Sequence, residues 1–161
     1  MKLRDSVIIV TGSATGLGSA IVKQVAAKGA RVVINYTKSE KEARETAAVC
    51  DNLGVESILC KADVSVDEDC RRMADLSMEK WGRIDGLVNN AARSVFANSK
   101  DLEALDGQQF MDVYSVNVVG AYQMTRAAAP HMKAGGDGSI VNVSSISALT
   151  GAGSSIAYVA S

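Results

Sequence analysis

The sequence is poor in the residues that mark several classes of protein. Its 161 residues include one proline, one histidine and three cysteines, and its formal net charge is −1. A charge so near zero gives no reason to expect nucleic acid or an acidic membrane surface as a partner. No apolar run is long enough to span a membrane, and the opening Met-Lys-Leu-Arg-Asp leaves no room for a signal peptide before the first apolar run. We therefore expect a cytoplasmic protein that binds neither nucleic acid nor membrane.

The scarce residues also bear on domain organisation. Cys50, Cys60 and Cys70 lie far apart and form no C-x-x-C pair, so we interpret them as reduced thiols and expect no metal site. A single proline and the lack of low-complexity segments indicate continuous helices without a linker. A hydrophobic fraction of 47% is ordinary for a soluble globular protein. Residues 1–161 are therefore predicted to form one domain.

Residues 6–18 carry the strongest local pattern. The apolar run Val7–Val10 is typical of a strand buried on both faces. Gly12, Gly16 and Gly18 follow with the spacing G-x-x-x-G-x-G and lead into a stretch with helical periodicity. Strand, glycine turn and helix begin a dinucleotide-binding βαβ unit, because residues without a Cβ let backbone N–H groups approach a pyrophosphate. The helix is expected to bury one face, formed by Leu17, Ile21 and Val25.

Beyond residue 18 the same alternation continues. Two capping boxes, Ser39 with Glu42 and Ser65 with Glu68, are expected to start the next two helices. The polar stretch 93–103 is expected to form a loop or short helix over one end of the sheet. Strands that alternate with helices predict an α/β fold, a doubly wound parallel sheet in a three-layer α/β/α arrangement. Further strands are expected at 31–35, 56–60, 84–89 and 138–143, and helices at 39–53, 65–81 and 106–133.

Small and polar residues follow each predicted strand. In a doubly wound sheet, ligands bind outside the carboxyl ends of the strands, at the point where the strand order reverses. The repeated placement of such residues at one edge predicts a ligand site there. They are residues 11–12, 35–38, 62–64, 89–92 and 144–145.

Six motifs together resemble the short-chain dehydrogenase/reductase family, and most of all its 3-oxoacyl-carrier-protein reductases. They are Thr11-Gly12-x-x-x-Gly16-x-Gly18, Asp63-Val64, Asn89-Asn90-Ala91-Ala92, the Asn117 of Ser-Val-Asn-Val-Val-Gly, the run 138–145, and Tyr158-Val159-Ala160-Ser161. The resemblance implies a Rossmann-like sheet, of which this chain supplies the first five strands. Ala92 replaces a glycine usual in the family. The lysine of the family's Tyr-x-x-x-Lys would come directly after Ser161, so we expect the C-terminal part of the fold to be missing and this span alone to be inactive.

The resemblance implies that Asn117, Ser145 and Tyr158 are catalytic. Tyr158 would protonate the carbonyl oxygen of a ketone while a nicotinamide delivers hydride to the carbon, and oxidation of a secondary alcohol reverses this. Ser145 would hydrogen-bond to the same oxygen, and Asn117 would hold a water in a proton relay through the lysine. A free tyrosine ionises only near about pH 10, so an adjacent ammonium is needed to favour the phenolate.

The second predicted strand ends without a carboxylate, which bears on the cofactor. An acidic side chain there would accept hydrogen bonds from the ribose and repel a phosphate. Lys38 is instead a charge suited to a 2′-phosphate, so NADP is favoured and NAD stays possible. The alternatives are an NAD-dependent enzyme for a sugar, polyol or steroid-like alcohol, and a nucleotide-sensing protein without turnover. The predicted cofactor residues are Gly12, Thr15, Gly16, Leu17, Gly18, Asn35, Tyr36, Thr37, Lys38, Asp63, Val64, Asn90, Ala91, Ala92 and Tyr158.

Two further expectations concern segments around the site. The predicted helix 106–133 carries more apolar surface than one sheet face needs, so we expect a homodimer or homotetramer. Residues 151–161 are expected to be poorly anchored, because a single helical turn is not stable without further packing. The apolar residues of the helix are Phe110, Val113, Tyr114, Val118, Ala121 and Tyr122.

Overall fold

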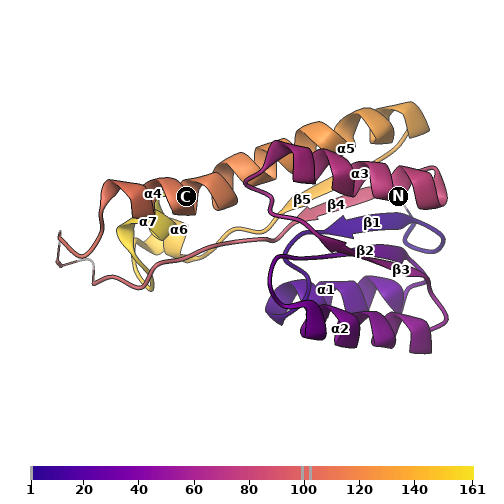
Figure 1. The fold of residues 1–161 in the computed structure, drawn as a ribbon, viewed down its shortest axis with the longest axis horizontal. Coiled ribbons are helices and arrows are strands. Elements are labelled where there is room, and N and C mark those ends of the chain that lie inside the picture. Colours follow the sequence, from indigo (N-terminus) through magenta and orange to yellow (C-terminus); the bar gives the residue numbers. More distant parts are fainter. Residues whose placement is uncertain (1, 99, 102) are drawn as a thin grey trace.

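The computed structural model describes residues 2–98, 100–101 and 103–161. These residues form the strands β1 (Val7–Val10), β2 (Arg31–Tyr36), β3 (Ser57–Lys61), β4 (Gly86–Asn89) and β5 (Ser139–Asn142). Neighbouring strands are parallel, and their order in the sheet is β3-β2-β1-β4-β5 (Figure 1). The prediction of a Rossmann-like, doubly wound parallel sheet is confirmed. The order reverses between β1 and β4, which is where a ligand site is expected.

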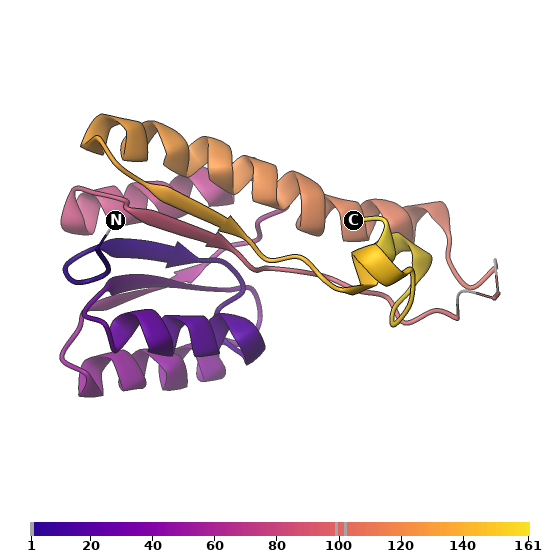
Figure 2. The same cartoon turned by 180° about the vertical axis from the view of Figure 1, so that it is seen from behind.

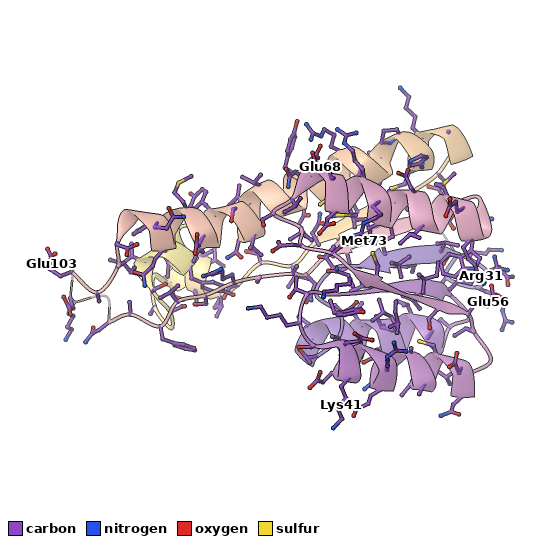
Figure 3. The ribbon with its side chains drawn as sticks, viewed as in Figure 1. Arg31, Lys41, Glu56, Glu68, Met73 and Glu103 are labelled. Carbon is purple, nitrogen blue, oxygen red and sulfur yellow. The ribbon has the colours of Figure 1, made fainter. Side chains whose placement is uncertain are left out.

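Helices cover both faces of the sheet. The helices α1 (Gly16–Ala26) and α2 (Glu40–Asn52) lie on one face, and α3 (Asp67–Trp81) and α5 (Ala121–Gly135) lie on the other (Figure 1). Successive strand residues point to opposite faces, so β1 feeds both cores. Ile8 is buried with the α1 and α2 side chains, whereas Ile9 is buried in the core that contains Met73 of α3. Figure 3 shows Met73 between α3 and the sheet.

The predicted helix 106–133 is a continuous helical stretch with an irregular centre. It consists of α4 (Gly107–Tyr114), the π-helical segment η1 (Ser115–Gly120) and α5. The stretch extends past the sheet, and α6 (Ser147–Thr150) and α7 (Ile156–Val159) lie beside its α4 end, as Figure 2 shows from behind. Periodicity did not predict η1, because its extra backbone residue per turn leaves no mark on composition. Such segments are rare and often occur at functional sites, and this one contains Asn117.

Both predicted capping boxes are wrong. Ser39 precedes α2 without a side-chain cap, and α3 starts after Val66. The Ser65 hydroxyl donates instead to Oδ1 of Asp63 at 2.7 Å, so it is already used in a local turn. A capping box forms at α4, where Asp106 accepts from the backbone N–H of Gln109 and the Gln109 side chain accepts from the N–H of Asp106.

The predicted buried face of α1 is shifted. The residues that α1 buries are Gly18, Ser19, Val22 and Ala26, and the side chain of Leu17 is 58% exposed. Ile21 and Val25 are half-buried at the margin of the core. The reason is that α1 approaches the sheet through its glycine and serine, which turns Leu17 outward at the carboxyl edge.

The amino edge of the sheet carries charges that pair with one another. Arg31 and Glu56 lie together there (Figure 3), with Nε of Arg31 3.9 Å from Oε2 of Glu56. Trp81 donates its indole N–H to the same Oε2 at 2.8 Å.

At one side of the sheet, β5 pairs with β4, and all four residues of β5 are exposed. Among the described residues, no helix is long and apolar enough to cross a membrane.

Candidate active site

A cavity of about 680 Å³ opens at the carboxyl ends of β1, β2, β3 and β4. We call it the glycine-turn cavity, because the turn between β1 and α1 forms one wall. The cavity is lined by all the predicted cofactor residues except Gly16 and Tyr158. The structure therefore gathers residues from four separate strand ends, as the sequence predicted from their placement.

The glycine turn has the backbone conformation that an anion site requires. Gly12 and Gly16 have φ values of +60° and +56°, a region that favours glycine. A Cβ at Gly16 would meet no atom within 4 Å, so this position faces open space. Thr15 precedes α1 without capping it through its side chain, which leaves the first N–H groups of α1 to other acceptors. These features fit the pyrophosphate of a dinucleotide at a helix N-terminus.

The turn is held to the end of β4 by two side chains. Thr11 is buried, and its hydroxyl oxygen accepts from the backbone N–H groups of Asn90 and Ala91 at 3.0 and 2.9 Å. The Asn90 side chain donates to the carbonyls of Thr11 and Gly12 at 2.9 and 3.1 Å. Sequence analysis placed Thr11 in the glycine motif but assigned no role to its hydroxyl, although a hydroxyl between an apolar strand and a glycine was an available signal. The side chain of Asn90 therefore supports the glycine turn from within the cavity wall.

The residues after β2 and β3 border the cavity differently. Asn35 is buried and its amide bonds to backbone groups, whereas Thr37 and Lys38 are exposed. Asp63 uses Oδ1 to accept from the backbone and hydroxyl of Ser65 at 2.9 and 2.7 Å. Its own backbone N–H donates to Asp69, and this bond holds the pKa of the Asp69 carboxyl below its usual range. The segment after β3 is thus fixed by α3.

A second cavity, of about 420 Å³, brings together the three predicted catalytic residues. We call it the tyrosine cavity: Asn117, Ser145 and Tyr158 line it together with Ser144. The prediction placed these residues on a helix, after a strand and on a following helix, and the structure has them on η1, after β5 and on α7. The two cavities share Val64, Ala91, Ala92 and Val116 as a common wall.

The amide of Asn117 is fully engaged. Its Oδ1 accepts from the backbone N–H of Arg93 at 2.8 Å, and its Nδ2 donates to the Arg93 carbonyl at 3.1 Å. Nδ2 also donates to the Ser161 hydroxyl at 2.7 Å. The guanidinium of Arg93 pairs with Asp112 of α4 at 2.9 Å. Asn117 therefore joins the segment after β4 to the segment that carries Tyr158.

The segment around Tyr158 is anchored in the structure, contrary to the expectation for residues 151–161. Ser155 and Ala157 are buried, and the Ser155 hydroxyl accepts from the N–H of Tyr158 at 3.4 Å. The hydroxyl of Tyr114 donates to the Ala160 carbonyl at 2.9 Å. A contact between the hydroxyls of Ser94 and Ser154 at 2.8 Å adds a third link. The partners of the last two links are distant in sequence, so local helix propensity could not reveal them.

A buried amide lies in the wall of the tyrosine cavity. Nδ2 of Asn89 lies 2.8 Å from Oδ1 of Asn142, 3.2 Å from Oγ1 of Thr125 and 3.3 Å from the Ala121 carbonyl. Because all three neighbouring atoms are oxygens, the Asn89 amide is oriented with its NH₂ group toward them. Within the described part of the chain, Oδ1 of Asn89 has no hydrogen-bond partner. This network ties β4 and β5 to the start of α5, directly after η1.

The cysteines take no part in either cavity. All three are buried, and burial raises the pKa of each thiol, that of Cys70 to about 12. Such thiols stay protonated and are poor nucleophiles and ligands. The described residues contain no group of three histidine, cysteine or acidic side chains placed to hold a metal ion.

The open parallel sheet, with cavities at the point where its strand order reverses, defines a Rossmann-like α/β protein. Residues 6–161 match the short chain dehydrogenase family, and the chain belongs to this family. A solved structure from Burkholderia xenovorans, described as a short-chain dehydrogenase/reductase, has a TM-score of 0.94 and 38% identity. The match covers 97% of this chain and 66% of that one.

Several curated proteins resemble the chain along most of its length. A Streptomyces violaceoruber protein of the granaticin polyketide synthase, named as a ketoacyl reductase, is 41% identical and is matched over 96% of this chain and 61% of its own. The NADPH-dependent aldehyde reductase 1 of Arabidopsis thaliana is 35% identical, with 99% and 56% covered. The L-rhamnose-1-dehydrogenase of Scheffersomyces stipitis is also 35% identical, with 92% and 58% covered. The chain thus spans about three fifths of the length of these relatives.

Proposed function

We propose that the protein is an NADP-preferring oxidoreductase that interconverts a ketone and a secondary alcohol, with residues 1–161 as its dinucleotide-binding domain. The observation that carries the proposal is the shared wall of the two cavities. Ala91 and Ala92 border both the glycine-turn cavity and the tyrosine cavity. A dinucleotide lying along the glycine turn would therefore reach the space beside Tyr158. That is the arrangement hydride transfer requires.

The proposed roles follow from the groups that line the tyrosine cavity. When bound, a reduced nicotinamide supplies the hydride. The Tyr158 hydroxyl donates its proton to the carbonyl oxygen of the substrate, and the Ser145 hydroxyl donates a hydrogen bond to the same oxygen. Asn117 holds the segments that carry Arg93 and Ser161 in place around the cavity. The family's lysine would follow Ser161, where its ammonium would favour the tyrosinate.

Ala92 does not strain the backbone in this arrangement. Asp5 is the one non-glycine residue with a positive φ in the described part of the chain, so Ala92 has an ordinary conformation. The replacement of the family's glycine is thus compatible with the fold.

The cofactor preference should depend on Lys38. At an effective dielectric of about 20, a charge pair at about 4 Å is worth about 4 kcal/mol before desolvation is subtracted. We expect Lys38→Ala to weaken NADP binding by about fivefold or more, a net loss of about 1 kcal/mol, with little change for NAD. Lys41→Ala is the matched control, because Lys41 does not line the cavity and its side chain points from α2 away from the sheet (Figure 3). Equal affinity of the unmutated protein for NADP and NAD would contradict the preference.

An assay of cofactor oxidation with a panel of ketones tests the proposed reaction. In the full-length protein, NADPH should be consumed in the presence of a ketone and not in its absence. The relative named L-rhamnose-1-dehydrogenase makes an NAD-dependent sugar dehydrogenase the second candidate. Turnover of sugars with NAD alone would favour that candidate, and cofactor binding without any turnover would favour a nucleotide sensor.

Self-association should use the exposed apolar side chains of α4, η1 and the start of α5, of which Val118 and Tyr122 also border the tyrosine cavity. Val113 is buried, whereas Met111, Tyr114, Val118 and Tyr122 are exposed at helical spacing. We expect the full-length protein to sediment as a dimer or tetramer at micromolar concentration, and Met111→Glu to shift it toward the monomer. Leu53→Glu, on an exposed leucine after α2, is the control. A monomer in the unmutated protein would count against this face as an interface.

A further inference from the structure

The end of β2 is where a dinucleotide-binding protein of this type reads the ribose of its cofactor. In this chain β2 ends in Asn35 and Tyr36, and Asn35 is only 2% exposed. We propose that Asn35 is a positioning residue that fixes the glycine turn and does not itself contact the ribose, so that reading of the 2′ position stays with the exposed Thr37 and Lys38. That a dinucleotide binds at this turn rests on the proposed function. The role of Asn35 in fixing the turn rests on the geometry alone.

The polar atoms of the Asn35 amide are all engaged with backbone. Oδ1 accepts from the N–H of Gly12 at 2.8 Å. Nδ2 donates to the Ala62 carbonyl at 2.9 Å and to the Cys60 carbonyl at 3.3 Å. The amide therefore joins the glycine turn to the end of β3, with β2 between them. No donor is left over for a ribose.

The backbone of Asn35 reinforces the same link. Its N–H donates to the Ser13 hydroxyl at 2.9 Å, and its carbonyl accepts from the N–H of Ser13 at 2.9 Å. Ser13 is buried, and its hydroxyl donates a hydrogen bond to the Val10 carbonyl at 2.6 Å. Asn35 and Asn90 thus hold Gly12 from opposite sides, one at its N–H and the other at its carbonyl.

The chemistry of the site requires an amide. One atom must accept from an N–H and another must donate to carbonyl oxygens, and asparagine is the smallest side chain that does both. A carboxylate at position 35 would accept from Gly12 but place a negative oxygen against two carbonyls. A protonated carboxyl would accept from Gly12 and donate to Ala62. An aspartate here should therefore behave like asparagine only when it carries a proton.

The test compares Asn35→Asp with Asn35→Ala in the full-length protein, by thermal unfolding between pH 8 and pH 5. A group whose folded pKa is raised above its unfolded value gives stability that is lost as pH rises through the folded pKa. We expect Asn35→Asp to unfold about 5 °C or more below the unmutated protein at pH 8, and this deficit to shrink by half or more at pH 5. The deficit of Asn35→Ala should not shrink. Measuring all three proteins at each pH cancels the titration of the neighbouring groups, which are Tyr36, Lys38, the Cys60 thiol, Lys61 and Asp63.

Measurements of cofactor binding distinguish a residue that positions the glycine turn from one that recognises the 2′ position of the ribose. At pH 8 Asn35→Asp should lower the affinities for NADP and NAD by a similar factor, whereas Thr37→Asp should weaken NADP tenfold or more relative to NAD. A tenfold change of that ratio by Asn35→Asp, with an unchanged unfolding midpoint, would overturn the proposal. If no dinucleotide binds but the pH-dependent recovery is seen, the role of Asn35 holds and the proposed function fails.

A measurement on the unmutated protein guards against variants that do not fold. The N–H of Gly12 should be protected from hydrogen exchange before any cofactor is added, because it bonds to Asn35 inside the protein. Fast exchange of this N–H in the free protein would contradict the proposal.

Discussion

Tyr158→Phe should lower the turnover of the full-length protein by about a hundred- to ten-thousandfold and leave cofactor affinity nearly unchanged. The substitution removes the hydroxyl that donates the proton and keeps the ring that lines the tyrosine cavity. The cofactor residues lie mainly along the neighbouring glycine-turn cavity, so binding should not depend on this hydroxyl. Initial rates with NADPH and a ketone, together with a cofactor titration, measure the two effects separately.

Tyr122→Phe is the matched control for this prediction. Tyr122 also lines the tyrosine cavity, but its side chain is 62% exposed and its ring faces the guanidinium of Arg126 at 5.5 Å. Removal of its hydroxyl should leave turnover within about twofold, since the ring that faces Arg126 is kept. Near-normal turnover of Tyr158→Phe would show that another group supplies the proton.

Gly18→Ala should damage both folding and cofactor binding. A Cβ at this position would lie 2.5 Å from the Gly12 carbonyl oxygen, 2.6 Å from Nδ2 of Asn90 and 2.8 Å from Cα of Ser13. Two of these atoms belong to the backbone, and the third is held by two hydrogen bonds. Moving any of them to make room for a Cβ would therefore cost free energy. We expect a loss of about 1 to 3 kcal/mol in the free energy of unfolding. Because the atoms that must move form the turn itself, cofactor affinity should fall by about tenfold or more.

The control is Gly107→Ala at the start of α4. A Cβ there would meet no atom within 4 Å, and Gly107 lines neither cavity. We expect it to change the unfolding midpoint by less than about 2 °C, since helix propensity favours alanine slightly. Chemical denaturation and a cofactor titration measure both variants. Equal midpoints and affinities for the two alanine variants would show that Gly18 is not the close contact that the structure describes.

The order of strands and helices could be predicted because each depends on local pattern. Val7–Val10 is apolar at every position and buried at every position, as a central parallel strand must be. The gathering of strand ends at one edge then follows from parallel topology alone. For this reason the predicted cofactor residues could be placed at that edge before their contacts were known, whereas Asn117, Ser145 and Tyr158 were predicted from the family resemblance.

The features that sequence analysis missed depend on which of several possible hydrogen-bond partners a side chain has in the folded protein. Ser65 could cap a helix or bond to Asp63, and only the turn geometry decides in favour of Asp63. Asn35 could face a ribose or the backbone of the glycine turn, and its burial decides for the turn. The links from Tyr114 and Asn117 to residues 160–161 join parts of the chain more than forty positions apart. Local propensity carries no information about such partners.

The most direct test of the central claim is the transfer of deuterium from NADPH labelled at C4 of its nicotinamide to a ketone, catalysed by the full-length protein. The account predicts an alcohol with deuterium on its carbinol carbon, formed by the unmutated protein and nearly absent with Tyr158→Phe. A protein that binds NADPH but yields no labelled alcohol from any ketone, or a Tyr158→Phe variant that transfers the label at the same rate, would contradict it.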